Sequence, residues 1–579
     1  MRFLPVRDDA LLIELDDLET TLALFDSLTS DPIPGTGEMI PGARTLLVSY
    51  RPSAVSPEQI VASARSRELG GRVAGAGSLI EIPVEYNGED LAEVAELLGV
   101  TPADVVRMHT GQDYAVGFTG FAPGFAYLSG GHPDLDVPRR SSPRTKIPAG
   151  SVALAGTFSG VYPRESPGGW QLIGTTPAQM WDLSRDRPAL LLPGDRVRFV
   201  DVSRSTGSPS ATVESVALSA DTDAEADDEV ETDAETDSSP NARAHIDFGL
   251  EILAPGMLTL LQDLGRPGFA SMGVSSSGAL DTVSLREANR LVGNASGSAC
   301  LEMTFGGLRM LARGEHVIAL TGAPVPLTVN SAAVTNPAVS GGARSASRSV
   351  PFGTPFALSD GEELVVGAPT TGIRSYLAVR GGFDIEPVLG SLSTDVLAGL
   401  GPNAVTAGTV LPVGTVARGI PSVALPETTS ATAATSATNS NPGSDSATDS
   451  DSGASDIVLD VVLGPRTDWF SADAVESLTG QSWLVSQKSN RVGLRLEGES
   501  LTRVIDAELP SEGTVSGAIQ IPPNGQPVLF LADHPLTGGY PVIGSVATYH
   551  LPRAGQLPPG ARIRFRPIGP FAEFREVTA

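Results

Sequence analysis

The sequence predicts a mainly β fold with a small α+β domain at its N-terminus. Gly (64) and Pro (46) are frequent among the 579 residues, and they favour tight turns over long helices. Short alternating apolar runs recur along the chain, whereas helical periodicity is confined to short segments. With 41% hydrophobic residues the chain can bury sizeable cores, and its length predicts about three to five domains.

The first 84 residues alternate between helix and strand patterns. Residues 16–30 have helical spacing, and residues 56–59 (Ser-Pro-Glu-Gln) form a capping box with Pro at the first helical position. Residues 45–50 and 79–84 have the pattern of strands. We therefore predict an α+β domain over residues 1–84.

A second unit is predicted over residues 85–202. Two helical segments, 89–98 and 101–108, precede a stretch from Gly117 to Trp170 that is dense in Gly, Pro and aromatic residues. Gly and Pro both oppose helix interiors, so this stretch predicts loops on a β scaffold. Residues 190–199 then predict a turn and a final strand.

Two polar segments divide the chain into three blocks. Residues 203–244 and 421–456 consist mainly of Ser, Thr, Ala and acidic residues, a composition that cannot offset the entropy of ordering. We predict an acidic disordered linker and a disordered insert. Between and after them, residues 245–420 and 457–579 predict two further β regions, the first with a helix near 283–291.

A weak repeat connects the blocks. Residues 192–199 resemble residues 557–565, and residues 359–364 occupy a comparable place in the middle block. The repeat suggests that similar barrels close with the same turn and strand.

Charge and cysteine usage exclude several partners. A large part of the net charge of −28 lies in residues 221–237, and no basic patch is available to neutralise nucleic acid or an anionic membrane. Cys300 is the only cysteine, which excludes an intrachain disulfide and a Cys-rich metal site. No run approaches the roughly 18 to 20 apolar residues of a membrane span. We expect a cytoplasmic protein.

The sequence lacks the motifs of several common activities. The chain contains two lysines, Lys146 and Lys488, and neither lies in a phosphate-binding loop or a biotin attachment sequence. The six His residues lack the spacing of a zinc hydrolase. The remaining candidates are Gly-rich polar clusters.

The clearest cluster is residues 533–541 (Asp-His-Pro-Leu-Thr-Gly-Gly-Tyr-Pro). Asp533 could move a proton, and the backbone N–H groups of Gly538 and Gly539 could meet an anion or a carbonyl oxygen. The alternative is a tight turn capped by its own acid. Glu512 and His109 are further candidates for proton transfer, against the alternatives of a strand-end residue and a helix cap.

Arg144 and Lys146 are the close cationic pair of the Gly-rich stretch. They could bind a carboxylate or a phosphate. The alternative is a solvated basic turn.

Motifs in the correct order resemble a known family. Those at 120–128, 143–153 and 166–170 are similar to allophanate hydrolase subunit 1, the family of KipI and of the B subunit of 5-oxoprolinase. Those at 262–268, 277–281, 288–294, 464–470 and 537–541 are similar to subunit 2, the family of KipA and of the C subunit of 5-oxoprolinase. The resemblance covers nearly the whole chain outside the two polar segments.

The resemblance implies an α+β cap and tandem cyclophilin-like β-barrels, one in the first half and two in the second. It also implies a composite site, with one wall from residues 117–170 and the other from 262–281 and 512–540. Residues 489–493 read Ser-Asn-Arg-Val-Gly where relatives often carry Ser-Asp-Arg-Met-Gly, so position 490 offers no carboxylate.

The candidate catalytic residues are therefore Glu512, Asp533 and His109. The candidate substrate- or ATP-binding residues lie in the motifs or beside them and are Phe121, Pro123, Gly124, Arg144, Lys146, Gly150, Ser151, Ser166, Gly168, Gly169, Gln262, Asp263, Arg266, Asp281, Ser489, Arg491, Gln520, Thr537, Gly538, Gly539 and Tyr540.

The resemblance further implies a fused B and C component of ATP-dependent 5-oxoprolinase, which opens 5-oxo-L-proline, a small lactam, to L-glutamate. This activity would require ATP with Mg²⁺ together with a separate 5-oxoprolinase A subunit, but no covalently attached biotin. One alternative is a carboxyltransferase module that acts on urea or an amide with biotin supplied in trans. The other is a KipI/KipA-like regulator of a histidine kinase. Exposed barrel edges also predict a homo-oligomer.

Overall fold

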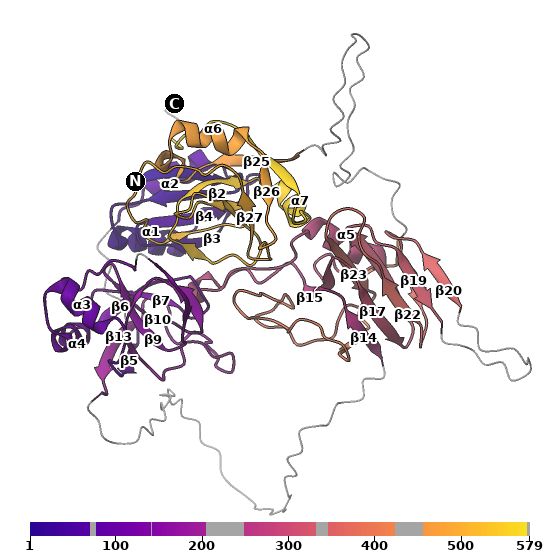
Figure 1. Cartoon of the computed structure of the whole chain (residues 1–579), viewed down its shortest axis with the longest axis horizontal. Coiled ribbons are helices and arrows are strands. Elements are labelled where there is room, and N and C mark those ends of the chain that lie inside the picture. Colours follow the sequence, from indigo (N-terminus) through magenta and orange to yellow (C-terminus); the bar gives the residue numbers. More distant parts are fainter. Residues whose placement is uncertain (70–76, 141, 204–247, 332–345, 423–455, 576–579) are drawn as a thin grey trace, which may run out of the picture.

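The computed structural model describes residues 1–69, 77–140, 142–203, 248–331, 346–422 and 456–575. The predicted linker and insert lie almost wholly outside these residues. Figure 1 shows an N-terminal domain (1–69), a first barrel (77–203), a middle unit (248–422) and a C-terminal barrel (456–575). The predicted mainly β architecture with tandem barrel-like units is confirmed. Within the described ranges, no helix is long and apolar enough to cross a membrane.

The N-terminal domain packs two helices on a four-stranded sheet of order β1-β2-β4-β3. Helix α1 (Leu18–Ser30) begins at Asp17, whose side chain accepts a hydrogen bond from Thr20 N, and α2 (Pro57–Arg65) begins with the predicted capping box. The strands are β1 (Arg2–Arg7), β2 (Ala10–Glu14), β3 (Thr36–Pro41) and β4 (Thr45–Tyr50).

The first barrel is a seven-stranded sheet of order β12-β9-β10-β7-β6-β13-β5, covered by α3 (Leu91–Leu98) and α4 (Pro102–Thr110). Its strands are β5 (Leu79–Val84), β6 (Tyr114–Thr119), β7 (Ala126–Ser129), β9 (Ser151–Ala155), β10 (Phe158–Val161), β12 (Gln171–Thr175) and β13 (Arg196–Asp201), with a separate pair β8 (Arg144–Ile147) and β11 (Ser166–Gly168). The predicted boundary at residue 84 is wrong, because β5 pairs in parallel with β13 along its whole length.

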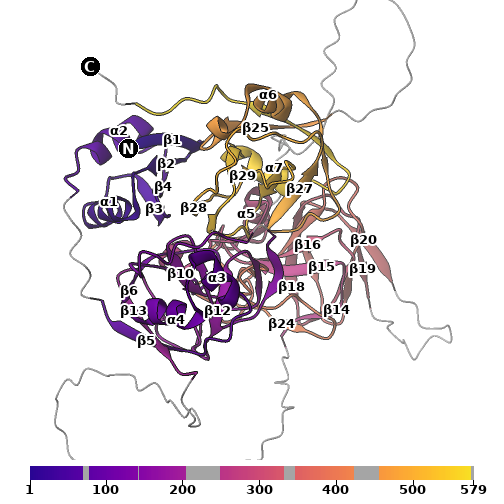
Figure 2. The ribbon, with the colours of Figure 1, turned by 60° about the vertical axis from the view of Figure 1, so that its left-hand side comes forward.

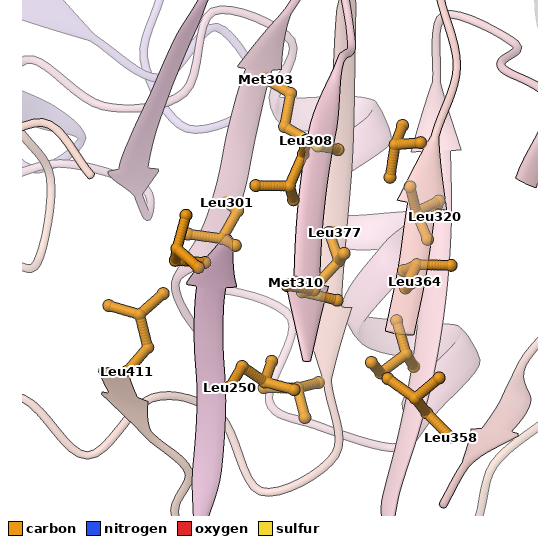
Figure 3. Packing of buried hydrophobic residues seen from close by; sticks show 14 of the residues in the cluster. Leu250, Leu301, Met303, Leu308, Met310, Leu320, Leu358, Leu364, Leu377 and Leu411 are labelled. Atoms are coloured by element: carbon orange, nitrogen blue, oxygen red, sulfur yellow. The ribbon is translucent and has the colours of Figure 1, made fainter. Parts of the chain in front are cut away.

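The middle unit packs a six-stranded and a five-stranded sheet around one apolar core (Figure 3). Helix α5 (Thr282–Val292) covers the outer face of the second sheet through Leu285, Ala288 and Leu291. The strands are β14 (Gly249–Pro255), β15 (Leu258–Gln262), β16 (Cys300–Thr304), β17 (Leu308–Arg313), β18 (His316–Gly322), β19 (Leu327–Asn330), β20 (Ser347–Val350), β21 (Phe356–Leu358), β22 (Glu363–Val366), β23 (Arg374–Val379) and β24 (Val410–Pro412).

The C-terminal unit is a closed barrel of order β25-β32-β29-β30-β27-β26-β33. Two helices, α6 (Ala472–Gly480) and α7 (Leu551–Gly555), accompany it. The strands are β25 (Ile457–Leu463), β26 (Trp483–Val485), β27 (Gly493–Glu497), β29 (Ala518–Gln520), β30 (Val528–Phe530), β32 (Val542–Val546) and β33 (Arg562–Pro567), with a separate pair β28 (Glu512–Gly513) and β31 (Thr537–Gly538).

The sequence repeat has a structural counterpart in two of the three units. Strands β13 and β33, which follow the repeated turn, each pair in parallel with the first strand of their own barrel, β5 and β25. In the middle unit the corresponding strand β22 instead pairs antiparallel with β17 and β19.

The N-terminal domain lies against the C-terminal barrel, at the opposite end of the chain (Figure 2). Apolar residues of β1 and β2, such as Leu4 and Leu12, share a core with Phe530 and Val542. Arg466 reinforces this contact, since its guanidinium ion-pairs with Glu14 of the N-terminal domain (2.7 Å) and with Glu512 of the C-terminal barrel.

Replacing Arg466 with Ala should lower the free energy of unfolding by about 3 kcal/mol, because the buried Glu512 carboxylate would lose its cation. Denaturant unfolding measures this loss. As a control, Arg309→Ala breaks an exposed pair with Glu363 and should cost about 0.5 kcal/mol. Equal losses in the two variants would contradict a role for Arg466 in joining the units.

Candidate functional site

The loop after β6 touches both parts of the second half of the chain. Phe121 N donates to Thr537 Oγ1 of the C-terminal barrel (3.0 Å). Thr119 Oγ1 donates to Ala270 O (2.8 Å), and Gly124 N donates to Met272 O (2.9 Å), both in the middle unit. The three segments of the two walls expected from the sequence, 117–170, 262–281 and 512–540, therefore meet at this loop.

The segments approach one another closely at this junction. Some positions therefore have no room for a Cβ atom, and others have a positive backbone φ angle. A Cβ on Gly120 would collide with the Thr537 side chain, and one on Gly273 would collide with the Ala122 carbonyl. Phe121 and Ser277 adopt left-handed backbone conformations, with φ of 63° and 52°. Such strain in residues other than Gly is concentrated at functional sites.

Two buried carboxylates, Asp395 and Asp533, lie close together where the middle unit meets the C-terminal barrel. Asp533 accepts from Ser277 Oγ (2.7 Å) and from Val396 N (3.0 Å). Its neighbour Asp395 accepts from Ser275 Oγ (3.2 Å). Burial and the Asp533 carboxylate raise the pKa of Asp395 to about 6. This carboxyl can therefore hold or release a proton near neutral pH.

Arginines surround the carboxylate pair. Arg491 binds both Asp533 oxygens (3.0 Å each) and also ion-pairs with Glu302 of β16. Arg266 donates to the Ser393 carbonyl, and its buried Nη1 has no hydrogen-bond partner among the described residues. Arg164 reaches from the first barrel to the Leu397 carbonyl. Cations from three units thus lie around two carboxylates.

A row of buried hydroxyl groups continues toward the first barrel. Arg139 Nη2 donates to Ser511 Oγ (3.2 Å), and Ser511 donates to the Tyr127 hydroxyl (3.2 Å). Tyr127 and Thr537 share a hydrogen bond of 3.4 Å. The row joins the two halves of the chain beside Gly538 and Gly539.

Several predicted residues lie at this junction, namely Phe121, Gly124, Gln262, Asp263, Arg266, Arg491, Gln520, Asp533, Thr537, Gly538, Gly539 and Tyr540. Gln262 Nε2 donates to Thr394 O (2.8 Å), and Asp263 accepts from Ser393 Oγ (2.6 Å), so both position the loop that carries Asp395. Gln520 Nε2 donates to Tyr540 O (3.2 Å). The first barrel, the middle unit and the C-terminal barrel all contribute.

His109 is wrongly predicted as catalytic, because it is a core residue of the first barrel. It is fully buried, and its ring nitrogens are hydrogen-bonded to the Tyr86 hydroxyl (2.6 Å) and Ser159 Oγ (2.8 Å). Its ring stacks on Phe199. Burial lowers the pKa of His109 to about 3, so the ring stays neutral inside the barrel.

Glu512 is also engaged structurally. Its carboxylate receives Arg466 Nε at 3.1 Å and a second guanidinium hydrogen bond, and the pair is buried. Burial raises the pKa of Glu512 against the opposing effect of Arg466. The prediction that Glu512 moves protons is not supported, because the carboxylate joins Arg466 in the contact with the N-terminal domain.

Arg144 and Lys146, which the sequence predicted as a pair that binds one anion, have different partners in the structure. Arg144 binds the buried Asp90 carboxylate (2.7 and 2.9 Å) and Glu89 (3.1 Å), whereas Lys146 forms an exposed pair with Glu165 (2.9 Å). Asp90 also accepts from Leu172 N (2.7 Å). The pairing supports the structural alternative for both residues.

The other predicted residues have local roles. Asp281 caps α5 through Ser284 N (3.0 Å) and accepts from Gln556 Nε2 (2.9 Å). Ser489 accepts from Arg495 N in a turn of the C-terminal barrel. The remaining ones lie in the 120–125 loop or around β8, β9 and β11 and are Pro123, Gly150, Ser151, Ser166, Gly168 and Gly169.

Sequence reasoning missed Asp395, Ser275, Ser277, Arg139 and Arg164. Ser277 and Arg139 lie in or beside recognised motifs, so their position was a usable signal. Asp395 lies in a Gly- and Ser-containing loop (390–401) with no motif. Its role follows from the packing of Asp533 beside it.

A cleft opens beside this junction, next to the contact between Thr119 and Ala270. This cleft of about 420 Å³ lies where the N-terminal domain, the first barrel and the middle unit meet, but the Gly268 and Ala270 amides at its edge donate to Glu38 (3.1 Å each). In the part of the chain that is described, no group of three or more His, Cys, Asp or Glu side chains could hold a metal ion.

The fold and the site define a class of tandem barrel proteins whose polar centre is assembled from separate units. Residues 272–567 match the family "Carboxyltransferase domain, subdomain A and B", and residues 1–191 match "Carboxyltransferase domain, subdomain C and D". The chain therefore belongs to the carboxyltransferase domain family and contains all four subdomains in one polypeptide.

Relatives match the two halves separately. The C subunit of 5-oxoprolinase from Escherichia coli (strain K12) is 33% identical over 319 residues, covering 55% of this chain and 90% of that protein. The B subunit of 5-oxoprolinase from Escherichia coli O157:H7 is 44% identical over 172 residues, covering 29% of this chain and 79% of that protein. The crystal structure of TTHA0988 is similar over 96% of this chain and 99% of that one, with a TM-score of 0.73 and 30% identity. The resemblance seen in the motifs is thus confirmed.

Arg144→Ala should lower the free energy of unfolding by about 1 to 2 kcal/mol, because the buried Asp90 would lose two of its hydrogen bonds. Lys146→Ala is the matched control and should change it by less than about 0.5 kcal/mol. Thermal unfolding of both variants measures the difference. A lower activity of Arg144→Ala without loss of stability would restore the binding role.

Asp395 should make stability depend on pH. Its pKa is raised from 3.8 to about 6, so its contribution to stability is fully present below about pH 4 and is lost as the pH rises through 6. Asp395→Asn cannot ionise, so this variant should gain stability relative to the unsubstituted chain between pH 4 and 7. Unfolding measured across this range tests the sign; a constant difference would contradict the raised pKa.

Proposed function

We propose that this chain is the fused B and C component of an ATP-dependent 5-oxoprolinase, which opens 5-oxo-L-proline to L-glutamate together with a separate A subunit. The similarity of its two halves to the B and C subunits of 5-oxoprolinase supports this function. Fusion keeps both halves of the composite site in one polypeptide, which raises their effective concentration to about the mM range for a flexible connection.

The observation that carries the proposal is the Asp395–Asp533 pair at the junction of three units. Asp533 is bound by Arg491, whereas the Asp395 carboxylate accepts hydrogen bonds from neutral donors, Ser275 Oγ and two backbone amides. The two carboxyls are thus held in different environments, as acid–base catalysis requires. With a pKa near 6, Asp395 is suited to accept and return a proton.

Ring opening then needs one water molecule and two proton transfers. Asp395 accepts a proton as water adds to the lactam carbonyl carbon. It returns that proton to the ring nitrogen as the carbon–nitrogen bond breaks, so the product carries a carboxylate and an amine. Arg266 Nη1 and Arg164 Nε, which lack hydrogen-bond partners among the described residues, stabilise negative charge on the carbonyl oxygen.

Lactam hydrolysis is unfavourable near neutral pH, so ATP would activate the amide oxygen in the assembled enzyme and would end as ADP and phosphate, which consumes a second water molecule. The described residues of this chain offer no phosphate cradle, so we assign nucleotide binding to the separate partner protein. This chain contributes the proton-transfer groups and the charges around the carbonyl.

A second candidate is a carboxyltransferase that acts on urea or another amide with carboxybiotin supplied in trans. The carboxyltransferase name of the matching family favours this candidate. The two functions differ in their co-substrate. Transfer of labelled carbon from carboxybiotin to an amide, without formation of glutamate from 5-oxoproline, would favour the second.

Asp395→Asn should lower kcat for ATP-dependent formation of glutamate about 100- to 1,000-fold in the complex reconstituted with the A subunit, because the proton acceptor is lost. Asp384→Asn, an exposed position of the middle unit, is the control and should leave kcat unchanged. The acid limb of the pH profile should have an apparent pKa near 6 and should disappear in Asp395→Asn. If the unsubstituted complex forms no glutamate from 5-oxoproline and ATP, the proposed function is wrong.

A further inference from the structure

Arg139 extends from the first barrel to the C-terminal barrel at the edge of the site. Its Nε forms an ion pair with Glu508 (2.8 Å), and its Nη2 donates to Ser511 Oγ (3.2 Å). The guanidinium packs against the backbone of Gly539, where a Cβ would collide with Nη1. Three contacts from two segments of the other half of the chain, residues 508–511 and Gly539, therefore fix its position.

The two partners of Arg139 differ in solvent exposure. Ser511, Tyr127 and Thr537, which continue the hydrogen-bonded row, are buried. The Arg139 side chain is 27% exposed, and the Glu508 side chain is 51% exposed. Another anion can replace a solvent-exposed partner of such a fixed cation, because water screens the ion pair and leaves it little net stabilisation.

Aromatic side chains lie beside this row. Phe121 donates its backbone N–H to Thr537, and its half-buried ring meets Tyr162 edge-on with 5.9 Å between centroids. Tyr127, a member of the row, packs against Phe125 at 5.2 Å. The left-handed backbone of Phe121 holds its ring in this cluster. A small flat ring could therefore contact an apolar surface close to a fixed guanidinium.

We propose that Arg139 is a specificity-determining residue that binds the carboxylate of a small cyclic amide, and that the ligand carboxylate replaces Glu508 on its guanidinium. This inference rests on the proposed function and names the substrate group that the site selects. A planar guanidinium matches a carboxylate through two parallel hydrogen bonds. A neutral lactam without the carboxylate would leave this cation with Glu508 and would bind weakly.

Calorimetric titration of the full chain with 5-oxo-L-proline and with 2-pyrrolidinone, its analogue without the carboxylate, tests the inference. Arg139→Gln should weaken binding of 5-oxo-L-proline about 10- to 100-fold, the range expected for lost hydrogen bonds to a charged group. Glu508→Gln removes the competing carboxylate and should tighten binding about two- to fivefold. Binding of 2-pyrrolidinone should be weak and equal in all three proteins.

Arg309→Gln, at an exposed ion pair of the middle unit, is the control and should bind 5-oxo-L-proline as the unsubstituted chain does. Opposite effects of the Arg139 and Glu508 substitutions cannot arise from a merely structural role. The inference is overturned if Arg139→Gln weakens both ligands equally, if Glu508→Gln also weakens binding, or if the unsubstituted chain does not prefer the carboxylate ligand.

The reconstituted complex separates this inference from the proposed function. If glutamate is formed and Arg139→Gln leaves KM for 5-oxo-L-proline unchanged, the inference fails and the function stands. If the carboxylate preference depends on Arg139 but no glutamate is formed with ATP in the reconstituted complex, the binding site stands and the function fails.

Discussion

Arg491 is the residue on which the composite site depends. Its buried guanidinium binds Asp533 of its own barrel through both carboxylate oxygens, and it ion-pairs with Glu302 and donates to Gly278 O (2.6 Å) in the middle unit. Removing one partner from such a buried cluster costs about 3 to 5 kcal/mol, because an uncompensated charge remains. The middle unit and the C-terminal barrel are therefore held in the arrangement that places Asp533 beside Asp395.

Among the described residues, the first barrel completes the site without a buried ion pair of this kind. Its contribution is the loop around Phe121, which lies between Thr537 and the 270–273 segment. Left-handed residues such as Phe121 and Ser277 cost about 1 to 3 kcal/mol each, so they persist only where surrounding contacts hold them. Both positions lie at contacts between units, which connects formation of the site to docking of the two halves.

Much of the local structure was predictable from the sequence. The capping box at Ser56 begins α2 as expected, the helix predicted from residue 101 is α4, and Thr45–Tyr50 is a strand. The Gly- and Pro-rich stretch indeed forms short strands and loops. The polar cluster at 533–541 drew attention to Asp533, and motif resemblance to Arg491 and Thr537. Asp395 was missed, because its neighbour Asp533 is more than a hundred residues away and no local pattern connects the two. Arg139 lies beside a motif, but its partner Ser511 is also more than a hundred residues away.

The sequence by itself determined the mainly β class, the helix starts and the family, because caps, turns and alternation depend on residues within a few positions of one another. Only the tertiary structure decided which polar residues are free to act. His109 is neutral within a barrel, Glu512 is paired with Arg466, and the N-terminal domain rests on the distant C-terminal barrel. Burial and ion pairing set protonation and availability, and both arise from packing between segments far apart in the chain.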